Sequence, residues 1–127
     1  MFIPITPEGA SRPIAPYVHG ARAGNTIYVA GTLAIGEDGT ALHVGDVKGQ
    51  TRSVIQQIVA TVEAGGGRIG DIAYNMIFIS DAGHYAGMNE VYTEFFGNNL
   101  PARYCIIAQL VKPEFLVEIA SIAHLED

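Results

Sequence analysis

The strongest constraint on the fold is one long segment, residues 47–64, whose apolar side chains recur at the spacing of a helix. Asp46 can cap the start of this helix with a side-chain oxygen, and three consecutive glycines at 65–67 end it. Segments rich in β-branched and aromatic residues precede and follow it, at 26–34 and 72–80. A helix between two strands has to cover one face of a sheet, which predicts an α+β protein.

The second half of the chain shows the same order of strand and helix. Asp81 is expected to cap a second helix and Gly97 to end it, with an apolar stripe between them formed by Tyr85, Met88, Tyr92 and Phe95. Two final strands are expected at 104–110 and 116–124, on either side of a turn at Pro113.

An early strand at about 17–22 is expected to turn at Gly24 and Asn25 into the strand at 26–34. Residues 1–127 are therefore predicted to form a single domain, a two-layer sandwich in which two α-helices pack on a mixed β-sheet. The three glycines at 65–67 end a helix rather than begin one, and no Gly-Lys-Ser/Thr follows them, so they do not indicate a phosphate-binding loop.

The low content of charged residues predicts an oligomer. Charged residues make up 16% of the chain, against about a quarter in ordinary soluble domains, and only Lys48 and Lys112 are lysines. Since large exposed apolar patches are rare on soluble monomers, we expect copies of the chain to cover apolar sheet surface between them.

The charge balance also disfavours several partners. The net charge is −6 with no basic cluster, so neither nucleic acid nor an anionic membrane is an expected partner. The first residues lack the basic start and apolar core of a signal peptide, and no apolar run approaches the ~18 residues that span a bilayer, so we expect a cytoplasmic protein.

Metal and covalent chemistry have little local support. The single cysteine, Cys105, cannot form an intrachain disulfide and has no second cysteine for a zinc site. No metal-binding spacing is present among His19, His43, His84 and His124. A Cys–His pair assembled in space stays possible, although a lone strand cysteine is more often a small core hydrophobe. The sequence also holds no Gly-x-Ser-x-Gly motif and no dinucleotide-binding fingerprint.

Arg103 and Glu118 are the candidate functional pair. Arg103 stands where the chain enters a strand, and Glu118 is a lone carboxylate between Val117 and Ile119. If the last two strands form a hairpin, a suitable register places Arg103, Cys105 and Glu118 on one side of the sheet. The pair is then either an ion pair that ties two strands together or a site where a guanidinium binds a carboxylate and an acid moves a proton.

Five sequence blocks are spread over nearly the full length of the chain: APYVHG at 15–20, YVAGT at 28–32, MNEVYTEFF at 88–96, PAR at 101–103 and VEIA at 117–120. In these blocks and in their spacing the chain resembles the Rid (YjgF) family of imine and enamine deaminases. Within the family, four further blocks are similar to the RutC branch of pyrimidine degradation: QTR at 50–52, IFISD at 77–81, LVKP at 110–113 and IAH at 122–124.

The resemblance implies a chorismate-mutase-like fold, a homotrimer with three clefts between subunits, and no cofactor. It implies that Arg103 grips a substrate carboxylate and that Glu118 positions the attacking water. It places Tyr17, Gly31, Asn89 and Cys105 along the cleft, with packing or surface hydrogen bonding as the alternative role for Tyr17 and Asn89.

The expected activity is deamination of a small enamine or imine acid, with 3-aminoacrylate giving malonic semialdehyde and ammonia. The alternatives are a general 2-iminopropanoate/2-aminoacrylate deaminase and a non-catalytic trimer that binds keto or imino acids. Some relatives are associated with RNA cleavage, which the acidic balance disfavours here. Two departures from the family pattern leave the exact substrate open, because Ala30 and Tyr104 stand where many relatives have serine.

Overall fold

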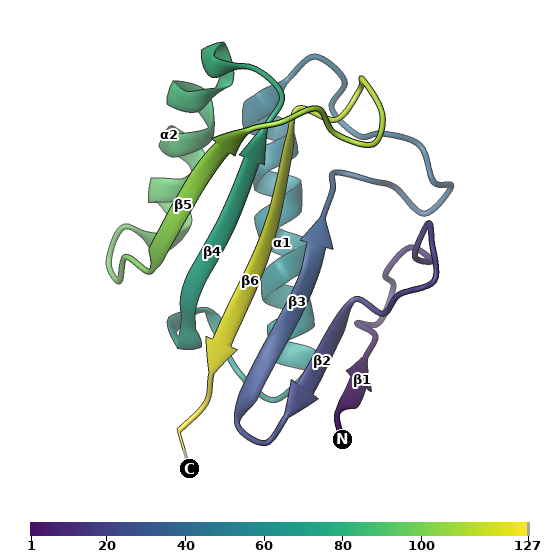
Figure 1. The fold of residues 1–127 in the computed structure, drawn as a ribbon, viewed down its shortest axis with the longest axis vertical. Helices are drawn as coiled ribbons and strands as arrows, with labels where there is room; N and C mark the ends of the chain where they lie inside the picture. The colour runs from purple at the N-terminus through teal and green to yellow at the C-terminus, as the bar shows by residue number, and fades with distance from the viewer. Residues whose placement is uncertain (127) are drawn as a thin grey trace.

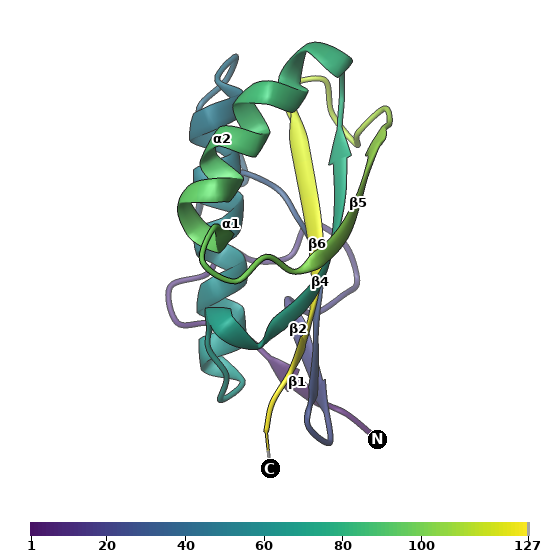
Figure 2. The same cartoon turned by 90° about the vertical axis from the view of Figure 1, so that its left-hand side faces the viewer.

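The protein folds into a six-stranded sheet with two α-helices on one face, as a computed structural model of residues 1–126 shows (Figure 1). Seen from the side, the helices and the sheet form two separate layers (Figure 2). The elements along the chain are β1 (Ile3–Ile5), β2 (Gly20–Ala23), β3 (Thr26–Thr32), α1 (Val47–Ala64), η1 (Ile69–Asp71), β4 (Ile72–Ile79), η2 (Ala82–His84), α2 (Tyr85–Phe96), β5 (Ala102–Ile107) and β6 (Val117–His124). The predicted α+β sandwich is confirmed.

The strand order is β1-β2-β3-β6-β4-β5, so the last strand of the chain lies in the middle of the sheet. All neighbouring strands are antiparallel except β4 and β5, which are parallel. The sheet is mixed, as predicted. The expected terminal hairpin is wrong, however, because β4 lies between β5 and β6 and pairs with both of them.

The predicted first helix is confirmed at both ends. Asp46 accepts a hydrogen bond of 3.0 Å from the backbone N–H of Gly49, which satisfies one of the free donors of the first turn. At the other end Gly66 adopts a φ of +97°, a conformation that glycine reaches without steric cost. The apolar stripe of α1 is buried in the core through Val54, Ile55, Ile58 and Val62.

The second helix begins later than predicted. Asp81 accepts a hydrogen bond from Gly83 N–H at 2.7 Å, which caps the short 3-10 turn η2 rather than the α-helix itself. The α-helix then starts at Tyr85 and ends at Gly97, as expected for a helix stop. Met88, Tyr92 and Phe96 face the core, whereas Tyr85 stays half-exposed.

The two faces of the sheet differ in exposure. Along β6 the odd-numbered residues are buried under the helices, and the even-numbered residues up to Ile122 are partly exposed on the other side. We call these sides the helix face and the open face. The open face carries the exposed side chains of Tyr28, Tyr104 and Ile106, each of which pairs across the sheet with even-numbered residues.

The remaining strands are shifted by a few residues from their predicted bounds. The strand expected from residue 17 begins only at Gly20, because the preceding segment is irregular and is tied down by a 2.7 Å hydrogen bond between His19 Nε2 and the Ser11 carbonyl. β3 ends at Thr32 rather than at residue 34. No helix within residues 1–126 is long and apolar enough to cross a membrane.

Candidate active site

Arg103 lies on the edge strand β5, and its side chain projects to the helix face. It pairs across the sheet with Asn75 of β4, whose side chain is fully buried beneath α2. The guanidinium Nη2 donates a 2.7 Å hydrogen bond to Asn89 Oδ1 and a 3.3 Å hydrogen bond to the Tyr85 hydroxyl. The guanidinium carbon also lies 4.7 Å from the centre of the Tyr92 ring, within range of a cation–π interaction. Three side chains of α2 therefore hold Arg103 in place.

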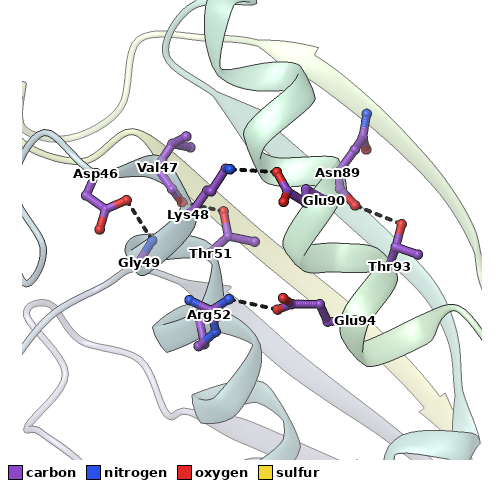
Figure 3. Close-up of polar contacts among 10 residues, drawn as sticks. All are labelled: Asp46, Val47, Lys48, Gly49, Thr51, Arg52, Asn89, Glu90, Thr93 and Glu94. Atoms are coloured by element: carbon purple, nitrogen blue, oxygen red, sulfur yellow. Dashed lines mark hydrogen bonds and ion pairs between the residues drawn. The ribbon is translucent and has the colours of Figure 1, made fainter.

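No carboxylate neutralises Arg103 within residues 1–126. The ion pairs of this part of the chain are Lys48–Glu90 at 2.6 Å and Arg52–Glu94 at 2.8 Å, both of which join α1 to α2 (Figure 3). A hollow of about 320 Å³ opens beside Arg103 and is lined by Asn89, Tyr92, Thr93, Leu100 and Pro101. An oriented cation with no anion beside an open hollow can bind a small carboxylate through two parallel hydrogen bonds.

Glu118 lies on the open face, half-buried. It pairs with Phe78 of β4, whose side chain points away from the helices. Burial raises the pKa of the Glu118 carboxyl above its ordinary value, because desolvation penalises the charged form. Within residues 1–126 its carboxylate makes no hydrogen bond or ion pair. A carboxyl group in such a setting can hold a water molecule or exchange a proton.

Gly31 lies directly against Glu118. The pairing of β3 with β6 shifts between Val29 and Thr32, and this irregularity leaves Gly31 facing the carboxylate. A Cβ atom added at Gly31 would lie 2.6 Å from Glu118 Oε2, so only glycine allows the carboxylate its present position. Tyr17 and Gly31 line the same narrow pocket of about 20 Å³.

The predicted site residues thus fall into two groups on opposite faces of the sheet. The anchor half contains Arg103 and Asn89, and the acid half contains Glu118, Gly31 and Tyr17. The expectation that Arg103 and Glu118 share a face is wrong, because Arg103 is in register with Asn75 whereas Glu118 is in register with Phe78, and these residues point to opposite sides of β4. The alternative of an ion pair between Arg103 and Glu118 is wrong for the same reason.

Cys105 belongs to the anchor face but not to the hollow beside Arg103. It follows Arg103 by two residues and packs, half-buried, against the hydrophobic core. Burial raises the pKa of its thiol, and the nearby Arg103 charge opposes this shift only in part. These features are typical of a small core side chain rather than of a nucleophile.

A further hollow of about 280 Å³ lies between the N-terminal loop and α1, and none of the predicted site residues lines it. Within residues 1–126 no group of three or more His, Cys, Asp or Glu side chains is arranged to hold a metal ion.

Sequence reasoning missed the supports of Arg103. Tyr85 and Tyr92 were identified only as members of an apolar stripe, whereas the structure places both aromatic rings against the guanidinium. Asn75 was not singled out at all. Its signal was present, because it is the one amide in the otherwise apolar and aromatic strand β4.

The structure thus defines a small two-layer α+β protein in which an arginine of an edge strand borders an open hollow. The family described as Endoribonuclease L-PSP matches residues 8–125, and the chain belongs to this family, which includes the YjgF and Rid proteins. The family predicted from the sequence blocks is confirmed.

Three solved structures illustrate the similarity. YjgF of Escherichia coli shares 32% identity with a TM-score of 0.88, over 98% of this chain and 99% of its own. TdcF of Escherichia coli, solved with bound serine, also shares 32% identity, with a TM-score of 0.87 over the same fractions. YyfA of Yersinia pestis, a Rid-family protein of unknown function, shares 27% identity with a TM-score of 0.89, over 98% of this chain and all of its own.

Proposed function

We propose that this protein is a cofactor-independent deaminase that hydrolyses 3-aminoacrylate to malonic semialdehyde and ammonia, as in the RutC branch of the family. Members of the Rid family are often imine or enamine deaminases. The observation that carries the proposal is the state of Arg103, which is oriented by Asn89, Tyr85 and Tyr92 beside a hollow and has no carboxylate partner within residues 1–126.

The bound serine in TdcF supports a small acid as the ligand of this chain. Serine and 3-aminoacrylate are both three-carbon acids that carry a carboxylate and a nitrogen substituent. An arginine can bind the carboxylate of either molecule in a bidentate manner.

We further propose that the active enzyme is a homotrimer whose clefts join the anchor half of one copy to the acid half of another. The two halves lie on opposite faces of one chain, so a single copy cannot apply both to one small substrate. The open face carries exposed apolar and aromatic side chains, including Tyr28 at 51% and Ile106 at 48% exposure, which a neighbouring copy would cover. Native mass spectrometry should show three times the 13.5 kDa chain mass.

The proposed reaction needs only positioning and proton transfer. Arg103 holds the substrate carboxylate, and the enamine gains a proton at its α-carbon to form an iminium ion. Water held beside Glu118 adds to the iminium carbon, and the resulting carbinolamine expels ammonia. Since a single acid–base group contributes roughly a hundredfold to ten-thousandfold, no metal or covalent nucleophile is required for a substrate that also hydrolyses in water.

The test is ammonia release from 3-aminoacrylate generated in situ, with 2-aminoacrylate as the isomeric comparison. Arg103→Ala should lower kcat/KM by roughly a hundredfold or more, because charge-assisted hydrogen bonds contribute about 1.5–3 kcal/mol each. Arg52→Ala is the matched control, since it removes the same charge from an exposed ion pair away from the site. Equal rates in the two variants would refute the role of Arg103.

Other outcomes would support the alternatives. Faster turnover of 2-aminoacrylate would indicate the general 2-iminopropanoate/2-aminoacrylate deaminase. Tight keto-acid binding without faster ammonia release would indicate a non-catalytic binding trimer. The family description includes endoribonuclease, but the net charge of −6 leaves RNA a disfavoured partner, and salt-sensitive RNA cleavage by the pure protein would overturn that prediction. A cytoplasmic location without a membrane partner stays part of the proposal.

A further inference from the structure

A row of buried polar side chains crosses the helix face of the sheet and ends at Arg103. Ser121 of β6, Asn75 of β4 and Arg103 of β5 are register partners across three adjacent strands. Asn75 and Ser121 are 0% and 1% exposed, and their neighbours on this face, such as Ile77 and Ile119, are apolar. The row is therefore the polar exception in a hydrophobic layer.

The row is linked to α2 through Tyr92. The Ser121 hydroxyl donates to Asn75 Oδ1, and Asn75 Nδ2 donates to the Tyr92 hydroxyl at 3.0 Å. The Tyr92 ring also packs against Phe96, with ring centres 4.6 Å apart. Asn75 thus fixes the hydroxyl end of the Tyr92 side chain, and Phe96 packs against the ring.

Packing alone does not account for these polar groups. A hydrogen-bonded pair in the core contributes about as much as a well-packed apolar pair of the same shape, so an apolar pair would serve stability equally well. The hydrogen bonds additionally fix the orientation of the Tyr92 side chain, because they hold its hydroxyl group at one point. The ring beneath the Arg103 guanidinium, 4.7 Å from its carbon, is thereby fixed as well.

We propose that Asn75 and Ser121 are positioning residues that lock the Tyr92 ring beneath Arg103 and so set the direction in which Arg103 presents its guanidinium to a carboxylate. The ring supports the guanidinium from one side, while Asn89 Oδ1 and the Tyr85 hydroxyl accept hydrogen bonds from Nη2. Nη1 has only the long contact with Met88 Sδ, at 4.0 Å, so the carboxylate is expected to bind on the side of Nη1 and Nε. This proposal deepens the proposed function, since it concerns the carboxylate anchor of the same site.

The test measures carboxylate affinity independently of turnover, with pyruvate as the probe and calorimetry as the assay. Tyr92→Phe keeps the ring and removes the hydroxyl, and Asn75→Val removes the other end of the same tether. Each should weaken pyruvate binding about threefold to tenfold, as expected for one lost hydrogen bond. The double variant should bind no more weakly than the weaker single variant, because both changes cut one connection. In the deaminase assay KM should rise while kcat stays within about twofold.

Thr51→Val is the matched control, since Thr51 is fully buried in α1 and its hydroxyl donates to the Val47 carbonyl at 2.7 Å, away from Arg103. It should lower the melting temperature without changing pyruvate affinity. If Asn75→Val does not fold, Ser121→Ala tests the far end of the same row. Pyruvate affinity equal to wild type in Tyr92→Phe, or additive losses in the double variant, would overturn the proposal. Weaker pyruvate binding in a protein that releases no ammonia would uphold the positioning role and reject the deaminase instead.

Discussion

Replacing Gly31 by alanine should displace the Glu118 carboxylate without unfolding the protein. The new Cβ atom would lie 2.6 Å from Glu118 Oε2, whereas ordinary contacts begin at 3.4 Å, so the carboxylate has to move by about 0.8 Å. The clashing atom is the far end of a flexible side chain, and it can rotate away at little cost in stability. Since misplacement of a reacting group by 1 Å can cost about a hundredfold in rate, we expect kcat to fall roughly tenfold to a hundredfold.

The assay is ammonia release from 3-aminoacrylate, followed with kcat and KM separated. KM should change little in Gly31→Ala, because Arg103 is untouched. Gly70→Ala is the matched control, since a Cβ at Gly70 meets no atom within 4 Å and its φ is not positive. Wild-type kcat in Gly31→Ala, or an equal loss of kcat in Gly70→Ala, would refute the reasoning that places the carboxylate of Glu118 at the reacting carbon.

Three further predictions concern pH and stability. Burial raises the pKa of Glu118 in the folded state, so ionisation of this carboxyl group destabilises the folded state as the pH rises through that pKa. Glu118→Gln should therefore be more stable than wild type at pH 8, with a smaller difference at pH 4. Urea unfolding at the two pH values measures this difference. The same variant should lose the acid limb of the pH–rate profile, which in wild type lies above the ordinary carboxyl pKa of 4.5. Lys48→Ala breaks an exposed ion pair and should leave the urea midpoint unchanged. Gln50→Leu, in contrast, leaves buried backbone groups without their hydrogen-bond partners and should lower the free energy of unfolding by about 2–4 kcal/mol.

The elements with local signals were predictable from the sequence. The helix α1 has its capping residue, its apolar period and its terminal glycines within one continuous segment, and both of its ends match the structure. The start of α2 was misplaced because Asp81 carries the same capping signal for a 3-10 turn as for an α-helix. The family, and with it the fold, was predictable because the matching blocks are spread over most of the chain.

The relation between Arg103 and Glu118 could not be predicted from periodicity. Adjacent strands in the sequence often pair, and that rule suggested a hairpin of β5 and β6. In the structure β4 lies between them, which depends on contacts between residues far apart in the sequence. As a result, Arg103 and Glu118 lie on opposite faces of the sheet. Likewise, Asn75 was visible as a lone amide in a strand, but its contact with Tyr92 depends on how α2 packs over the sheet.

Complementation between two strongly impaired variants tests the intersubunit site most directly. Arg103→Ala chains and Glu118→Gln chains would be unfolded together in equal amounts, refolded, and assayed for ammonia release. If each cleft takes Arg103 from one copy and Glu118 from the next around a ring, about a quarter of the clefts in the mixture contain both native residues. We expect recovery of about a quarter of the wild-type rate, and a mixture no faster than the separate variants would contradict the intersubunit site.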